Sequence, residues 1–113
     1  MKLHHVGVAV ADLDEAIARH QRMGLKLAHR EVVSSQKVEV AFMGEGPFIE
    51  LLVGTSADSP VSKFVAKKGP GQHHLAFAVP SIPQELERQA AAGAELIDRA
   101  PRPGAWGHQV AFV

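Results

Sequence analysis

The chain of 113 residues contains no cysteine. This absence excludes a disulfide framework, a thiolate nucleophile, a zinc ribbon and an iron–sulfur site together. The chain also lacks a surplus of charge of either sign, because 12 lysines and arginines balance 12 aspartates and glutamates. Without a basic excess we expect no nucleic-acid partner and no attraction to an anionic membrane surface.

Long apolar runs are missing as well. No stretch approaches the ~20 apolar residues of a membrane-spanning helix, and the start MKLHHV does not have the pattern of a signal peptide. We therefore expect a cytoplasmic protein with no membrane partner. Hydrophobic residues are 46% and charged residues 21%, which is ordinary globular composition and enough for one domain.

Histidine, in contrast, is plentiful, with seven in the chain. Four of them form the pairs His4-His5 and His73-His74, and these pairs begin two similar segments. Residues 4–27 and residues 73–96 align without a gap at an offset of 69, with seven identities in 24 positions. The alternative is two generic strand–helix segments that look alike by chance. We interpret them as two copies of one supersecondary unit, joined at the glycines around position 70.

Hydrophobic patterning predicts the elements of each copy. The first copy predicts a strand, a helix that ends at Gly24, and three further strands, in the order β-α-β-β-β. The second predicts a strand, a helix that ends at Gly93, and two short strands, with its last strand absent. The expected ranges are Leu3–Val10, Leu25–Val33, Lys37–Met43 and Phe48–Val53 in the first copy, a connector helix at Val61–Lys67, and His74–Val79, Glu95–Ile97 and Gln109–Val113 in the second.

These elements predict an α+β fold in which two tandem βαβββ modules form one curved mixed sheet, with helices on its convex face. We expect a single domain over residues 1–113. Within it, module one covers 1–54, the connector helix and linker cover 55–71, and the incomplete module two covers 72–113.

Alternation along the first strand of each copy separates two faces. One face carries bulky apolar residues, suited to pack under the helices. The other carries a histidine followed by two small residues: His5, Gly7 and Ala9 in the first copy, and His74, Ala76 and Ala78 in the second. Small side chains leave space, so we expect this face to line a cavity into which His5 and His74 point.

Two carboxylates interrupt otherwise apolar strands, Glu39 in KVEVAF and Glu50 in FIELLV. A buried carboxylate is costly unless it is paired or bound to a metal, although exposure on an edge strand would remove that cost. Two imidazoles and one carboxylate suit a divalent first-row metal and leave coordination positions open. We predict His5 and His74 as ligands; His4 and His73 share a face with the packing residues.

The remaining histidines, His20, His29 and His108, are expected at the surface.

Three stretches together carry a family resemblance: HHVGVAVADLDEAI at 4–17, FIELLVGTSADSPVSKFVAKKGPGQHHLAFAV at 48–79, and GAELIDRAPRPGAWGHQVAFV at 93–113. The chain resembles the vicinal oxygen chelate superfamily, and within it most resembles the methylmalonyl-CoA epimerases. The resemblance implies a dimeric isomerase that holds a divalent cation (cobalt, zinc, manganese or nickel) and inverts the α-carbon of an acyl-CoA.

The same resemblance implies roles for particular residues. His5, Glu50 and His74 match the family's metal ligands, and Glu39 matches its proton-transfer base. The family continues with a histidine-proline-lysine loop and a last strand that carries a glutamate as fourth ligand, and the sequence as given ends at Val113 before that strand. We expect activity to depend on that missing strand.

Two alternatives remain open on the same fold. One is another metalloenzyme, of the glyoxalase or the extradiol dioxygenase type, since a His-His-Glu triad also suits iron(II) oxygenases. The other is a protein without catalytic activity that binds a small molecule, as the bleomycin-resistance proteins do. The fold does not decide among them.

Overall fold

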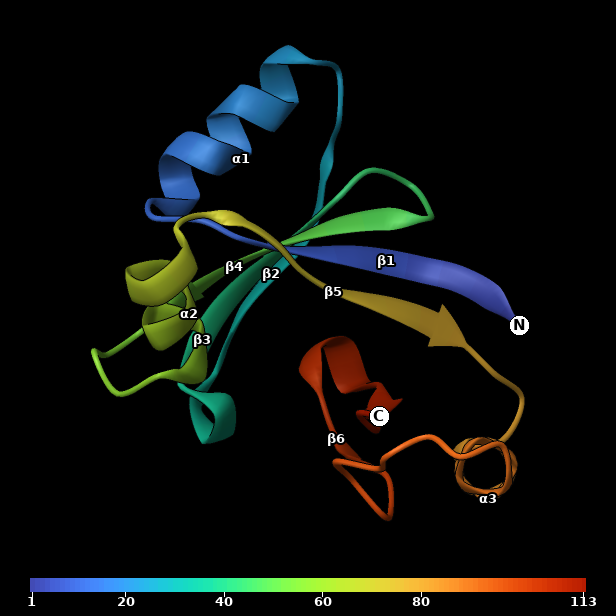
Figure 1. Ribbon diagram of the computed structural model, residues 1–113. Helices are drawn as coiled ribbons and strands as arrows, with labels where there is room; N and C mark the ends of the chain where they lie inside the picture. The colour runs from blue at the N-terminus through green and yellow to red at the C-terminus, as the bar shows by residue number, and fades with distance from the viewer. The chain divides into compact units, whose positions relative to one another are not determined.

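The computed structural model describes all residues, 1–113, and divides them into two compact units (Figure 1). One unit is Leu3–Phe77, and the other combines Met1–Lys2 with Ala78–Val113. The first unit carries most of the secondary structure, whose elements are β1 (Lys2–Ala9), α1 (Leu13–Arg22), β2 (Leu27–Val33), η1 (Ser34–Gln36), β3 (Val38–Met43), β4 (Phe48–Gly54), α2 (Pro60–Lys68) and β5 (Gly71–Ala78).

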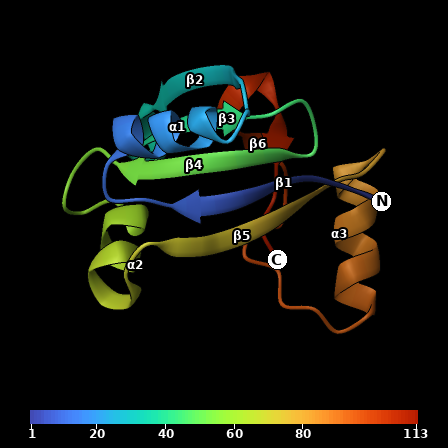
Figure 2. The same cartoon turned by 90° about the horizontal axis from the view of Figure 1, so that it is seen from above.

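Five strands make one mixed sheet in the order β2-β3-β4-β1-β5. Strands β2, β3 and β4 are antiparallel neighbours, whereas β1 runs parallel to β4. In Figure 2, β4, β1 and β5 lie side by side. The expected α+β class and the β-α-β-β-β order of the first copy are both confirmed. No helix here has the length and apolar character needed to span a bilayer.

Helix α1 begins and ends where its sequence signals indicate. The carboxylate of Asp12 accepts a hydrogen bond from the backbone N–H of Glu15 at 3.0 Å, which satisfies one free donor of the first turn. After the helix, Gly24 adopts φ +97°, a left-handed conformation that costs glycine little. Helix α1 is therefore held at both ends by local contacts.

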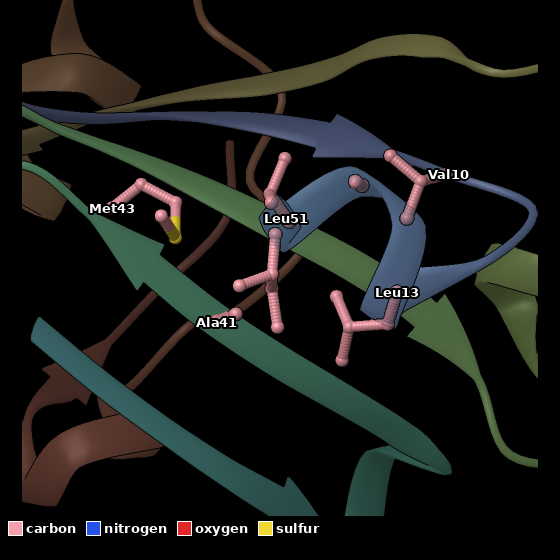
Figure 3. Close-up of a cluster of buried hydrophobic side chains, with 7 residues drawn as sticks. Val10, Leu13, Ala41, Met43 and Leu51 are labelled. Atoms are coloured by element: carbon pink, nitrogen blue, oxygen red, sulfur yellow. The ribbon is translucent and has the colours of Figure 1, made fainter. Parts of the chain in front are cut away.

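The core of the first unit lies between α1 and one face of the sheet. Figure 3 shows Leu13 and Val10 close to Leu51 of β4, with Ala41 and Met43 of β3 beside them. Ala41, Met43 and Leu51 are fully buried. Because β-strand side chains alternate, the residues between these core positions must face the other side of the sheet.

The connector helix forms at α2, from Pro60 to Lys68, one residue longer at each end than expected. Ser59 is buried at its N-terminus, and its hydroxyl accepts from the N–H of Val61 at 3.2 Å. This cap and the proline at the first helical position explain the start of the helix.

The second unit contains α3 (Ile82–Ala91), β6 (Arg102–Pro103), η2 (Ala105–Gly107) and β7 (Gln109–Val110). Strands β6 and β7 pair with each other in a separate two-stranded sheet. We expected one sheet shared by both modules. Of the second module's strands, only β5 belongs to the five-stranded sheet. The expected strand at Gln109–Val113 is reduced to β7, and β6 was not expected.

The strand expected at Glu95–Ile97 is not formed, and this prediction was wrong. The segment is tied to the last residues by other means. The N–H groups of Ile97 and Asp98 both donate to the carbonyl of Phe112, and the Asp98 carboxylate accepts from the N–H of Phe112 at 2.9 Å. This segment is therefore a loop held by the side chain of Asp98, and not the strand that the sequence pattern predicted.

Candidate metal centre

The register of β1 against β4 places the first part of the site. Gly7 lies opposite Glu50, and His5 lies opposite Phe48 two residues earlier. Neighbouring strands are ~4.8 Å apart, so Glu50 and β5 are separated by the width of β1. A side chain from β5 can reach Glu50 only by passing over β1.

His74 makes that crossing and completes a three-residue cluster. The Oε1 atom of Glu50 lies 3.2 Å from Nε2 of His5 and 3.3 Å from Nε2 of His74. The two Nε2 atoms are 3.1 Å from each other. One donor atom from each residue thus converges on one point, with all three atoms within 4.8 Å of one another. We call His5, Glu50 and His74 the triad.

Gly7 makes the crossing possible. A Cβ atom built on Gly7 would lie 2.1 Å from Cε1 and 2.4 Å from Nδ1 of His74, far inside van der Waals contact. The imidazole of His74 therefore fills the space that any larger residue at position 7 would occupy. The absence of a side chain at position 7 thus leaves room for the His74 ring, and the cavity expected on this face stays a prediction.

Glu50 is buried, and its charge is compensated within the triad. Burial raises the pKa of Glu50, but hydrogen bonds and charge from His5 and His74 together lower it by more. The net result is a pKa of about 2, so Glu50 is an anion at neutral pH. No buried side-chain nitrogen or oxygen in the chain lacks a hydrogen-bond partner.

The histidine that precedes each triad histidine touches it. Nδ1 of His4 lies 2.8 Å from Nδ1 of His5, and Nδ1 of His73 lies 3.0 Å from Nδ1 of His74. Burial lowers the pKa of His73, and the neighbouring His74 lowers it further, while Glu50 opposes both. His73 is therefore biased toward its neutral form.

Glu39 is not brought to the triad. Its strand partner is Val53, and it lies three residues before Phe42, which pairs directly with Glu50. Alternation then directs Glu39 to the face that α1 covers. Its carboxylate accepts from Nε of Arg30 at 2.9 Å, and the same guanidinium donates to Asp14 of α1 at 2.8 Å. Its role as a base stays a prediction.

Two more residues lie on the triad face: Phe42, which was not singled out from the sequence, and the half-buried His29, which was expected at the surface. The ring of Phe42 packs edge-on against His5, with 5.5 Å between centroids. His29 pairs with Phe42 across β2 and β3, and its Nε2 lies 2.8 Å from Oε1 of Glu31. Phe42 pairs with Glu50, so it lies on the triad face, but only the β3–β4 register reveals this.

The donor set of the triad fits a divalent first-row cation. It offers two imidazole nitrogens and one ionised carboxylate oxygen, a combination common to zinc, cobalt, manganese, iron and nickel sites. The donors come from three adjacent strands of one sheet, which fixes them relative to one another before any ion binds. A site with three protein ligands also leaves positions open for a substrate.

Comparison with known proteins gives the class to which this fold and site belong. A family model described as the glyoxalase, bleomycin resistance protein and dioxygenase superfamily matches residues 4–112. The chain belongs to this superfamily, the same group that the sequence motifs resemble.

Two of the similar proteins are named as acyl-CoA epimerases. The chain is 40% identical to the uncharacterised protein YqjC of Bacillus subtilis, over 99% of this chain and 81% of that protein. It is 31% identical to the ethylmalonyl-CoA/methylmalonyl-CoA epimerase of Cereibacter sphaeroides, over 99% of this chain and 87% of the relative. The solved methylmalonyl-CoA epimerase of Mycobacterium tuberculosis superposes with a TM-score of 0.89 at 32% identity, covering 96% of this chain and 75% of that one.

Replacing either triad histidine tests the ligand set. His5→Ala or His74→Ala should abolish tight binding of a divalent cation, because two remaining ligands are too few for a structured site. His20→Ala is the matched control, since His20 bonds to the carbonyl of Ala16 on α1. Metal content by plasma mass spectrometry after loading with Co²⁺ measures the effect. Content near one ion per chain in both triad variants would refute the assignment.

The role of Gly7 can be isolated with a double-mutant cycle. Gly7→Ala should lower the free energy of unfolding and displace the His74 ring, because the added methyl group occupies its position. In a His74→Ala background the same change should cost little, because the ring is gone. Urea unfolding of the four proteins measures the coupling. Equal costs in both backgrounds would show that Gly7 does not accommodate His74.

Proposed function

We propose that this protein is a metal-dependent epimerase that inverts the α-carbon of a carboxylated acyl-CoA such as methylmalonyl-CoA. The observation that carries the proposal is the triad: one buried carboxylate and two imidazoles converge on one point of the sheet. The choice of reaction is supported by relatives that are named epimerases of this substrate and that align along almost the whole chain.

The chemistry of the substrate explains why such a site is suitable. The α-hydrogen lies between a thioester and a carboxylate, and its removal leaves negative charge on the neighbouring oxygens. When bound to His5, Glu50 and His74, a divalent cation would supply Lewis-acid stabilisation of that charge. A Streptomyces coelicolor methylmalonyl-CoA epimerase that is 28% identical to this chain has been solved with 2-nitronate-propionyl-CoA, an acyl-CoA ligand.

Residues of the chain divide the other tasks. Glu50 contributes a permanent negative charge, because its pKa is about 2. His5 and His74 contribute imidazole nitrogens, and Gly7 keeps the space between β4 and β5 open for the ring of His74. Phe42 is buried and packs against one edge of the His5 ring.

Glu39 is proposed as the base that removes the α-proton, an assignment that rests on the family resemblance. Because Arg30 holds its carboxylate on the α1 face of the sheet, this role requires Glu39 to leave the ion pair and the start of β3 to rearrange when substrate binds. Variants of Glu39 and of Arg30 can therefore test whether Glu39 is the base.

Uptake of deuterium from heavy water into methylmalonyl-CoA tests the activity, because it reports proton removal without requiring net inversion. The metal-loaded chain should exchange the α-proton, and the His74→Ala variant should not. A chain that binds the cation and methylmalonyl-CoA but exchanges nothing would favour a binding protein instead. Oxygen uptake with catechol by the iron(II)-loaded chain would favour the dioxygenase alternative, which the same two-histidine, one-carboxylate donor set permits.

Glu39→Gln should lower this exchange by ~10²–10⁴-fold while metal content is unchanged, because glutamine keeps the size of the side chain but cannot take the proton. Arg30→Gln is the matched control: it breaks the same ion pair and leaves the carboxylate intact. Equal loss of activity in both variants would show that the ion pair is needed and that Glu39 is not the base. Exchange that survives Glu39→Gln would remove Glu39 from the mechanism.

We also propose that the protein is a homodimer. Leu75 and Phe77 of the edge strand β5 are each about half exposed and offer apolar surface to a second copy. Sedimentation velocity should find a species of twice the chain mass, and Phe77→Ser should shift it toward monomer. A wild-type chain that stays monomeric at high concentration would contradict the proposal.

A further inference from the structure

Each triad histidine makes two kinds of contact with its two ring nitrogens. The Nε2 atoms of His5 and His74 point at Glu50 and at each other, at 3.1–3.3 Å. Their Nδ1 atoms lie 2.8 and 3.0 Å from Nδ1 of His4 and His73. The two contacts therefore use opposite sides of each ring, one toward the metal position and one away from it.

The proton count of a neutral imidazole links these two sides. A ring that offers the lone pair of Nε2 to a cation must carry its single proton on Nδ1. That Nδ1–H needs an acceptor, and Nδ1 of the preceding histidine is within hydrogen-bond distance. His4 and His73 can accept only if their own protons are on Nε2. One arrangement of protons thus satisfies both pairs and leaves both ligand lone pairs directed at the metal position.

The same device occurs twice, once in each copy of the repeated segment. His4 and His73 stand at equivalent positions, and each also packs against a phenyl ring. The centroid of His4 is 5.6 Å from that of Phe48, and the centroid of His73 is 4.9 Å from that of Phe64. These contacts hold the accepting rings in place beside the ligands. Repetition at two independent sites argues against a chance approach of neighbouring side chains.

We infer that His4 and His73 are positioning residues that accept the Nδ1–H of His5 and His74 and so hold the ligand rings in the tautomer and orientation that a divalent cation requires. The inference rests on the metal site proposed above and adds the outer layer of that site. Outer partners of this kind typically change metal affinity by ~10–100-fold when they are removed.

Substitution by phenylalanine and by asparagine separates hydrogen bonding from packing. His4→Phe and His73→Phe keep a flat ring in contact with Phe48 or Phe64 but remove the acceptor. His4→Asn and His73→Asn lose the ring, yet their Oδ1 stands the same number of bonds from the backbone as Nδ1 and can accept. His20→Phe is the control, because His20 lies on α1 and bonds to a backbone carbonyl.

Two measurements are needed. The dissociation constant for Co²⁺, followed by its visible absorption, should rise ~10–100-fold in each phenylalanine variant and recover in the asparagine variants. The urea midpoint of the metal-free protein should be close to wild type in the phenylalanine variants. Nitrogen-15 NMR of the Zn²⁺-loaded wild type should find Nδ1 of His4 and His73 without a proton.

The outcomes distinguish this inference from the proposed function. Phenylalanine variants that bind Co²⁺ as tightly as wild type, or protonated Nδ1 atoms in His4 and His73, would overturn the positioning role while leaving the metal site intact. Loss of Co²⁺ binding in the asparagine variants alone would show that ring packing, not hydrogen bonding, supports the site. A wild-type chain that binds no Co²⁺ would overturn both the metal site and its outer layer.

Discussion

The structure of the site depends on one buried negative charge. Glu50 lies in the middle of an apolar strand, where an unpaired carboxylate would be strongly unfavourable. Two imidazoles approach the same oxygen of Glu50, and they lower its pKa to about 2 in spite of burial. The charge is therefore retained in the interior, and the groups that retain it are also good metal ligands. A purely structural role would be better served by an apolar residue at position 50.

Backbone geometry explains how distant residues meet at that charge. His5 and Glu50 come from adjacent parallel strands, but His74 comes from the far side of β1 and has to cross it. The glycine at position 7 is the feature that permits the crossing. The opposite face of the same strands packs against α1 with Ala41, Met43 and Leu51. Rigid packing on one face thus supports a precise arrangement of polar groups on the other.

Much of this arrangement could be predicted from the sequence. The repeat of a histidine followed by small residues at alternate positions predicted both imidazoles of the triad, and the family resemblance chose Glu50 from the two carboxylates that interrupt apolar strands. The placement of Glu39 relative to the triad depends on the β3–β4 register, in which Phe42 and not Glu39 shares the face of Glu50. Apolar patterning alone could not reveal that register. The end of the chain was harder still, because Asp98 organises it through side-chain bonds that leave no periodic signal.

The contacts around the triad form two layers. The inner layer is the set of three donor atoms, and the outer layer is the pair of preceding histidines, each within hydrogen-bond distance of a triad ring and packed on a phenyl group. The repeated strand–helix segment accounts for both layers, because it supplies two His-His pairs on neighbouring strands of one sheet. Glu50 is the one triad residue without a counterpart in the repeat. Its carboxylate lies within reach of the triad histidine of each copy.

X-ray absorption spectroscopy of the Co²⁺- or Zn²⁺-loaded chain reports the atoms bound to the ion, so it can show whether the triad holds a metal. We predict two imidazole rings at about 2.0–2.1 Å from zinc together with light oxygen donors in the wild type, and no imidazole-bound ion in His74→Ala. A spectrum with only oxygen donors, or with the same number of imidazole rings in wild type and His74→Ala, would contradict the assignment of this face of the sheet as a metal centre.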